Sequence, residues 1–243
     1  MAVILILGAL SDIARSLAQV YARNKFDLVL AARRSERLER DVEDLKIRYG
    51  VHIDRCEFDV TDYGSHKTFY ESLDPKPDGV ICAVGYFGEH HKAHESFNES
   101  RKIIDTNYTG CVSILNIVAG DFEKRGKGFI VGISSVAGDR GRRSNYLYGS
   151  AKAGFTAYLS GLRGRLSQSG IQVLTVKPGF VYTKMTEDMD LPGILTAEPD
   201  KAAADIFNAQ QKGRDVVYTK WFWRYLMTII KHIPERFFKR ISF

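Results

Sequence analysis

Two residues that can exchange a proton stand four positions apart in the segment YLYGSAK, residues 146–152. Tyr148 and Lys152 are at i and i+4 and therefore share one helix face, whereas the residue four places after Tyr146 is Ser150. A phenol has a pKa near ~10, which a nearby ammonium group lowers because it favours the phenolate. The pair could therefore deliver a proton at neutral pH. The spacing by itself is more typical of a helix start with a surface lysine.

The elements that would hold this pair follow from the hydrophobic pattern. Short apolar runs predict strands at Val3–Leu7, Asp27–Ala31, His52–Phe58, Gly79–Ala83, Gly128–Ile133, Gln172–Lys177 and Val216–Tyr218. Longer amphipathic stretches predict helices at Asp12–Asn24, Ser35–Tyr49, Tyr63–Leu73, Phe97–Lys124, Tyr146–Ser169 and Pro199–Gln211. Apolar strands separated by helices indicate a parallel sheet covered on both faces. The sequence thus predicts a doubly wound α/β fold with seven parallel strands.

Length and composition are those of one soluble domain, with 243 residues, 44% hydrophobic and 26% charged. The three cysteines, Cys56, Cys82 and Cys111, are far apart and fit neither a disulfide framework nor a metal site, which predicts no metal and a cytoplasmic location. The apolar start is interpreted as a buried first strand rather than a signal peptide, because it lacks a basic segment and runs into a glycine turn.

The positive charge is concentrated in the last 24 residues. Lys220 to Phe243 contain six Lys or Arg and one acid, Glu235, which gives +5 of the total +6. This asymmetry argues against a nucleic-acid binder and predicts a domain over 1–219 with a basic aromatic helical tail over 220–243. The composition of 221–243 is that of a helix at a membrane interface, which predicts peripheral contact with the inner membrane face. The alternative is a helix packed on the core or on another subunit.

The first strand ends in LGALSDIA, a strand-to-helix turn that can place a helix N-terminus against a pyrophosphate. Gly8 is the one expected glycine that is present, because Asp12 and Ala14 occupy the other two positions. We therefore predict cofactor contacts from Gly8, Ser11, Asp12 and Ile13. The alternative is a tight turn in which Asp12 is a helix N-cap.

The second strand is followed by LAARRSERL, where a dinucleotide site chooses its ribose. An acid there binds a free 2′-hydroxyl, whereas an arginine accommodates a 2′-phosphate. Ala32 offers no acid and Arg33 offers a planar cation, with Arg34 as support, so NADP(H) is favoured over NAD(H). Asp59 and Val60, after the third strand, are predicted beside the adenine.

Further signals follow in order along the chain. Asn107 falls inside a predicted helix, and Ser135 stands at a strand end, thirteen residues before Tyr148. After the sixth strand come Pro178, Gly179, Val181 and Thr183 in KPGFVYT. With Tyr148 and Lys152, this ordered set resembles the classical short-chain dehydrogenase/reductase family across essentially the whole core. The resemblance implies a single-domain Rossmann-type fold.

The same resemblance implies roles for the catalytic set. Tyr148 would be the general acid that protonates a carbonyl oxygen, and Ser135 would hydrogen-bond that oxygen. Lys152 would bind the nicotinamide ribose and lower the Tyr148 pKa, and Asn107 would support a water-linked proton relay to Lys152. The family's usual Asn-Asn-Ala-Gly is here CAVG, in which Ala83 and Gly85 remain as cofactor contacts. Pro178, Gly179, Val181 and Thr183 are also predicted to contact the cofactor.

The loop GDRGRRSN precedes the predicted catalytic helix and carries Arg140, Arg142 and Arg143. Arginine side chains suit phosphate recognition, so these three are predicted to bind substrate together with Ser135 and Tyr146. The alternatives are a solvated basic loop and, for Tyr146, a packing role.

Two segments, RGRRSNYLYGSAKAG and RYLMTIIKHIPERFFKR, resemble the decaprenylphosphoryl-2-keto-D-erythro-pentose reductase group. This narrower resemblance implies reduction of a keto group on a lipid-linked or phosphorylated sugar. The alternatives are a generic ketone or 3-oxoacyl reductase and a non-catalytic, cofactor-sensing binding protein. Fold analogy suggests a homo-oligomer.

Overall fold

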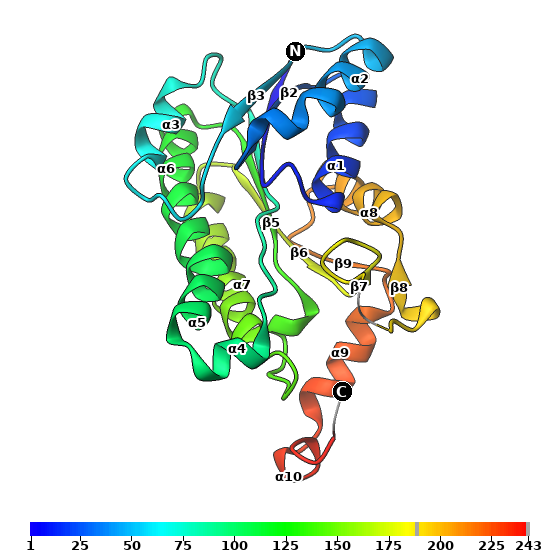
Figure 1. The fold of residues 1–243 in the computed structure, drawn as a ribbon. Coiled ribbons are helices and arrows are strands. Elements are labelled where there is room, and N and C mark those ends of the chain that lie inside the picture. Colours follow the sequence, from blue (N-terminus) through cyan, green and yellow to red (C-terminus); the bar gives the residue numbers. More distant parts are fainter. Residues whose placement is uncertain (188–189, 242–243) are drawn as a thin grey trace.

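The computed structural model describes residues 1–187 and 190–241 and is built around one central sheet (Figure 1). Its seven strands lie in the order β3-β2-β1-β4-β5-β6-β9, and every neighbouring pair is parallel. The strands are β1 (Val3–Leu7), β2 (Asp27–Ala32), β3 (Ile53–Glu57), β4 (Gly79–Cys82), β5 (Phe129–Ile133), β6 (Gln172–Pro178) and β9 (Val216–Thr219). The strand order reverses between β1 and β4, and ligands of such sheets bind at this point beyond the carboxyl ends.

Helices cover both faces of the sheet, because successive side chains of each strand point to opposite faces. On β1, Ile4 and Ile6 pack in the cluster under α1 (Asp12–Arg23), α2 (Glu39–Tyr49) and α8 (Pro199–Gln211). Leu5 and Leu7 pack in the other cluster, under α3 (His66–Ser72), α6 (Gly110–Arg125) and α7 (Tyr146–Ser167). The predicted doubly wound α/β fold is confirmed.

The long helix predicted over Phe97–Lys124 is wrong in one respect, because it is interrupted. α5 (Phe97–Ile104) is followed by a π-helical turn, Asp105–Thr109, before α6 begins at Gly110. Asn107, at the centre of the turn, donates from its side-chain amide to the Ile103 carbonyl at 2.8 Å. Such π turns are frequent at functional sites. Two other predicted helices start later, since Ser35–Leu38 is a 3₁₀ turn and α3 begins at His66.

Several short elements at the carboxyl edge were not predicted. They are α4 (His90–Glu95), the 3₁₀ turns Val136–Gly138 and Gly193–Leu195, and a small parallel sheet of β7 (Phe180–Val181) and β8 (Thr196–Ala197). They are too short for a periodic signal in the sequence. Together they surround the region beyond the ends of β4, β5 and β6.

The C-terminal segment forms two short helices, α9 (Trp223–His232) and α10 (Glu235–Phe238), on either side of the predicted break at Pro234. One face of α9 packs on the domain, where Trp223 is 2% exposed and contacts the cluster around Val136. The packed-helix alternative therefore describes this face. Phe243, the end of the predicted tail, lies outside the described residues. Among the described helices, none combines the length and apolar character required to span a bilayer.

Candidate active site

Two adjoining hollows lie beyond the carboxyl ends of the strands. The inner cavity has a volume of about 330 Å³ and extends from the start of α1 to the start of α7. The outer hollow, of about 260 Å³, extends from Gly8 to the arginines after β2. Both are lined by Leu10, Ser11, Ala83, Val84 and Gly85, so they form one continuous cleft.

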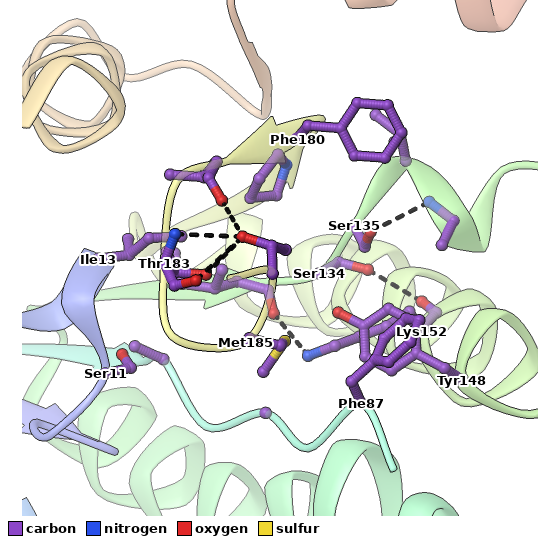
Figure 2. Close-up of a pocket in the computed structure, with 18 of the residues that line it drawn as sticks. Ser11, Ile13, Phe87, Ser134, Ser135, Tyr148, Lys152, Phe180, Thr183 and Met185 are labelled. Atoms are coloured by element: carbon purple, nitrogen blue, oxygen red, sulfur yellow. Dashed lines mark hydrogen bonds between the residues drawn. The ribbon is translucent and has the colours of Figure 1, made fainter. Parts of the chain in front are cut away.

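Tyr148 and Lys152 meet in the inner cavity, one turn apart on α7 (Figure 2). The Tyr148 ring packs on Phe87 with ring centroids 5.1 Å apart. The Lys152 side chain is buried, and its Nζ donates to the carbonyl oxygens of Ile133 at 3.0 Å and Val84 at 3.3 Å. Nζ lies 5.8 Å from the centroid of the Tyr148 ring. The shared helix face expected from the spacing is therefore present.

Ser135 reaches the same cavity from the end of β5. It is the N-cap of the 3₁₀ turn Val136–Gly138, and its Oγ accepts a hydrogen bond from the Ala137 amide at 3.1 Å. Because Oγ acts as the acceptor in that bond, its own proton can be donated to a ligand in the cavity. The hydroxyl of the neighbouring Ser134 is directed toward α7 and donates to the Lys152 carbonyl at 2.9 Å, which links the end of β5 to α7.

Asn107 is buried behind the cavity wall. Its amide group donates to the Tyr86 carbonyl at 2.6 Å, and its Oδ1 accepts from the Tyr86 amide at 3.1 Å. A Cβ atom at Gly85 would lie 3.7 Å from Asn107 Oδ1 and 3.8 Å from Lys152 Nζ, so Gly85 stands between the two side chains. The proton relay through Asn107 stays a prediction.

The turn after β1 has the geometry expected for close approach of a ligand to the backbone. Gly8 has φ +81°, and a Cβ atom there would lie 2.9 Å from the Val84 amide nitrogen, so no larger residue fits. The N-cap of α1 is Ser11, whose Oγ accepts from the Ala14 amide at 3.3 Å. The alternative of Asp12 as N-cap is wrong, because the Asp12 carboxylate accepts from the Lys184 amide at 2.8 Å. Ser11, Asp12 and Ile13 all line the inner cavity.

Three arginines line the outer hollow, two of them predicted. Arg33 and Arg34 are exposed there, and Arg37 joins them from the 3₁₀ turn Ser35–Leu38. The turn is held by Glu57, whose carboxylate accepts from the Ser35 and Arg34 amides at 2.8 Å each. These two hydrogen bonds lower the pKa of Glu57. The sequence analysis did not single out Arg37, which fell inside the helix predicted over Ser35–Tyr49, where the structure has the 3₁₀ turn.

The two residues predicted beside the adenine, Asp59 and Val60, have different positions in the structure. Val60 lines the outer hollow, whereas the Asp59 carboxylate accepts hydrogen bonds from the amide and hydroxyl of Thr61 at 2.9 and 2.8 Å. Burial raises the pKa of Asp59, and the Thr61 bonds outweigh that effect and leave the pKa below its ordinary value. Asp59 thus shapes the turn that presents Val60.

The end of β6 and the segment after it line the inner cavity with Pro178, Gly179, Val181 and Thr183. A Cβ atom at Gly179 would lie 1.9 Å from Nε1 of Trp223 in α9, which excludes any side chain there. The indole nitrogen donates to the Leu195 carbonyl at 3.1 Å. The C-terminal helix therefore supports the loop that was predicted to contact the cofactor.

Comparison with known proteins agrees with this arrangement. Residues 2–191 match the sequence model of the short-chain dehydrogenases. An uncharacterised oxidoreductase of Mycobacterium tuberculosis is 34% identical over 98% of this chain and 96% of its own length. Another, from Streptomyces coelicolor, is 31% identical over 98% of this chain and 95% of its own length. The chain belongs to the short-chain dehydrogenase family.

A solved structure of the same family is similar over nearly the whole fold. The short-chain dehydrogenase from Sphingobium yanoikuyae, in complex with NADPH, has a TM-score of 0.85 to this chain at 26% identity, with 97% of each chain covered. The similarity extends beyond the family model into the C-terminal part of the chain.

The three arginines predicted to bind the substrate lie apart in the structure. Arg142 is buried and lines the inner cavity near Ser135, and burial lowers the pKa of its guanidinium. Arg140 instead fastens the tail, since it donates to the Lys231 and Ile233 carbonyls and to the Glu235 carboxylate at 2.8, 3.2 and 2.6 Å. Arg143 is exposed and, like Arg140, is not among the described residues that line the cavity.

Tyr146 also stays outside the lining among the described residues. It is 46% exposed and stacks on His94 with ring centroids 5.4 Å apart, which is the packing role left open by the sequence. Among the lining residues that sequence reasoning missed are Phe87, Asn145, Phe180 and Met185. Of these four, Asn145 had a signal, since it closes the arginine loop directly before α7.

Proposed function

We propose that this short-chain dehydrogenase is an NADP(H)-dependent reductase that converts a ketone into a secondary alcohol. The observation that carries the proposal is the meeting of Ser135, Tyr148 and Lys152 in one cavity that continues into the arginine-lined hollow. A proton donor, a hydrogen-bond donor and a cation then surround the space in which a carbonyl group would lie.

The cleft suits a dinucleotide in three respects. Gly8 leaves room for a pyrophosphate beside the N-terminus of α1, whose first amide groups point toward an anion. Arg33, Arg34 and Arg37 suit the 2′-phosphate of an adenosine ribose. The related dehydrogenase from Sphingobium yanoikuyae was solved with NADPH, which supports the same choice here.

The nicotinamide of bound NADPH supplies the hydride that reaches the carbonyl carbon. Ser135 donates a hydrogen bond to the carbonyl oxygen and fixes its orientation, while Tyr148 transfers its hydroxyl proton to that oxygen. The Lys152 ammonium, held by the Ile133 and Val84 carbonyls, stabilises the phenolate that this transfer leaves on Tyr148. Phe87 and Phe180 cover apolar parts of the wall and exclude water from the reacting atoms.

The cofactor choice gives the first prediction. The double variant Ala32→Asp/Arg33→Ile should shift the ratio of kcat/KM for NADPH to that for NADH by about tenfold or more toward NADH, because it removes a phosphate-binding cation and adds an acceptor for the 2′-hydroxyl. Steady-state rates with each cofactor measure the ratio. Arg40→Ile, an exposed arginine outside the hollow, is the matched control and should leave it unchanged. A wild type that already prefers NADH would refute the assignment.

We infer further that the substrate is a phosphorylated or lipid-linked keto-sugar. Arg142 supports this reading, since a buried cation in the cavity wall recognises an anionic or hydroxyl-rich substrate better than a plain ketone. A suitable carbonyl panel contains D-ribulose 5-phosphate, D-ribulose, ethyl acetoacetate and cyclohexanone. A generic ketone or 3-oxoacyl reductase would not need the phosphate.

A lipid-linked substrate would be met at a membrane surface, and the outer face of α9 suits one. Trp221, just before α9, and Tyr225 and Ile229 on it follow at intervals of four residues and are 74%, 62% and 65% exposed. Arg224 and Lys231 on α9 and Arg236 on α10 are also exposed, and none has an ion pair among the described residues. Aromatic side chains with flanking cations are typical of peripheral binding to anionic lipids.

The second prediction tests this face without removing the helix, because truncation would also take Trp223 from Gly179. The triple variant Trp221→Ser/Tyr225→Ser/Ile229→Ser should lose sedimentation with anionic vesicles that the wild type shows at low salt. Ile47→Ser, at a still more exposed isoleucine on α2 (84%), should sediment like the wild type. If the triple variant instead changes the oligomeric state, the face is a subunit interface.

A further inference from the structure

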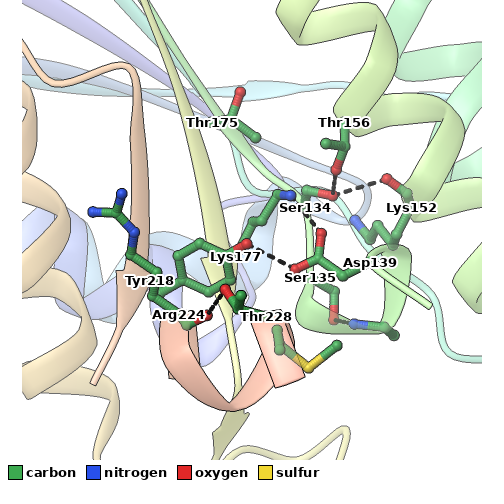
Figure 3. Close-up of polar contacts among 12 residues, drawn as sticks. Ser134, Ser135, Asp139, Lys152, Thr156, Thr175, Lys177, Tyr218, Arg224 and Thr228 are labelled. Carbon is green, nitrogen blue, oxygen red and sulfur yellow. Dashed lines mark hydrogen bonds and ion pairs between the residues drawn. The ribbon is translucent and has the colours of Figure 1, made fainter. Parts of the chain in front are cut away.

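A buried ion pair lies directly behind Ser135. Lys177 Nζ is 2.5 Å from Asp139 Oδ1, and the two side chains are only 10% and 3% exposed. The hydroxyl of Tyr218 donates to the second carboxylate oxygen, Asp139 Oδ2, at 2.8 Å. Figure 3 shows Asp139 between Lys177, Tyr218 and the Ser135 turn, with α9 packed alongside. Among the described residues, no other ion pair has both side chains less than 20% exposed.

The pair connects the two segments that form the cavity wall. Ser135 begins the 3₁₀ turn Val136–Gly138, and Asp139 ends it with an amide hydrogen bond to the Val136 carbonyl at 3.1 Å. Lys177 directly precedes Pro178 and Gly179, and Tyr218 lies on the neighbouring strand β9. A change in the ion pair can therefore move Ser135 through the Asp139 turn and the Pro178 loop through Lys177.

Stability alone does not account for this arrangement. Two charges lose their hydration when they are buried, and an apolar pair of similar volume often stabilises a fold equally well. The ion pair and the Tyr218 hydrogen bond together fix the orientation of the Asp139 carboxylate, because charge-assisted hydrogen bonds are short and directional. Burial and the bond to Asp139 raise the pKa of Tyr218, so its phenol remains a donor. Two other cations interact electrostatically with these residues, Arg142 with Asp139 and Arg224 with Tyr218.

We propose that Asp139 and Lys177 are positioning residues that fix the Ser135 hydroxyl relative to Tyr148, with Tyr218 holding the second carboxylate oxygen. The inference rests on the proposed reductase activity. Without the pair, the Asp139 end of the turn is no longer tied to Lys177 of β6, and Ser135 Oγ shifts from the carbonyl oxygen. A displacement near 1 Å at a reacting group can slow catalysis by about 10²-fold.

The test is single-turnover hydride transfer in Asp139→Asn, followed by loss of NADPH absorbance with the panel ketone that the wild type reduces fastest. Each rate is expressed per NADPH site, titrated by fluorescence, so that a loss of folded protein lowers the number of sites and not the rate. We expect the rate per site to fall by about tenfold or more and the Kd for NADPH to change by less than about twofold.

A matched control exists on the far side of the domain. Tyr70 and Arg125 bind the Asp121 carboxylate at 2.8 Å each, which repeats the tyrosine–carboxylate–cation arrangement away from the cavity. Asp121→Asn should lower the melting temperature but retain the rate per site. If Asp139→Asn does not fold, Tyr218→Phe removes one hydrogen bond and keeps the ion pair, and Asp139→Asn/Lys177→Met removes both charges; each should slow hydride transfer per site.

The outcomes separate this proposal from the reductase proposal. A wild type that reduces no ketone of the panel refutes the reductase activity itself. An active wild type with an unchanged rate per site in the Asp139 or Tyr218 variants refutes only the positioning role. An equal fall in Asp121→Asn would also refute it, because the effect would then come from general destabilisation.

Discussion

Replacing Tyr148 with phenylalanine should lower kcat for ketone reduction by about 10²–10⁴-fold and change the Kd for NADPH by less than about twofold. The substitution removes the proton donor and keeps the ring that packs on Phe87. Lys152 retains its hydrogen bonds to Ile133 and Val84, so the cofactor side of the cleft is unaltered. Steady-state kinetics over the carbonyl panel and a fluorescence titration with NADPH measure the two quantities.

Tyr146→Phe is the control, since this tyrosine is on the same helix but stacks on His94 outside the cavity lining. It should retain turnover within about twofold, because no hydroxyl contact with substrate is removed. Normal turnover in Tyr148→Phe together with an inactive Tyr146→Phe would reverse the assignment. A wild type that binds NADPH but transfers no hydride to any panel ketone would instead favour the cofactor-sensing alternative.

The central sheet could be predicted because burial on both faces leaves a direct trace in the sequence. β1 is fully buried, and its side chains alternate between two apolar clusters, so every position must be hydrophobic. β4 is likewise buried at every position, and β5 at every position after Phe129. The predicted strand ends differ from the observed ones by about a residue, because backbone hydrogen bonding, and not the side-chain pattern, decides where a strand stops.

The meeting of Tyr148 and Lys152 could be predicted because its geometry is local. A spacing of four residues on one helix already fixes which side chains share a face, and Tyr148 and Lys152 follow that rule. Gly8 was predictable from the strand-to-helix turn, where glycine lets a ligand approach the backbone closely, and the structure gives it φ +81°. Neither inference required knowledge of distant contacts.

The remaining features depend on contacts between segments far apart in the chain. Arg140 and Arg142 are two residues apart and had the same predicted role, yet one binds the tail and the other lines the cavity. Their difference arises from the position of α9, which the sequence alone does not fix. The same is true of Gly179, whose need for glycine comes from Trp223, 44 positions later.

Arg142→Gln should lower kcat/KM for D-ribulose 5-phosphate by about 10–10²-fold, and that for D-ribulose by less than about threefold. A charge-assisted hydrogen bond to phosphate contributes about 1.5–3 kcal/mol, and burial in the cavity wall removes competing water. The loss should be mainly in KM, because an interaction that is equally strong in the ground and transition states affects binding without changing kcat. Initial rates for the two sugars, at saturating NADPH, give the ratio.

The matched control is Arg143→Gln, which removes the same charge from the next position of the same loop. Arg143 is exposed and is not among the described residues that line the cavity, so this variant should act on both sugars like the wild type. Any long-range effect of one positive charge would be shared by the two variants and screened by salt, whereas a direct contact would persist. Equal losses on D-ribulose 5-phosphate and D-ribulose in Arg142→Gln would mean that Arg142 shapes the loop, and phosphate recognition at this wall would be excluded.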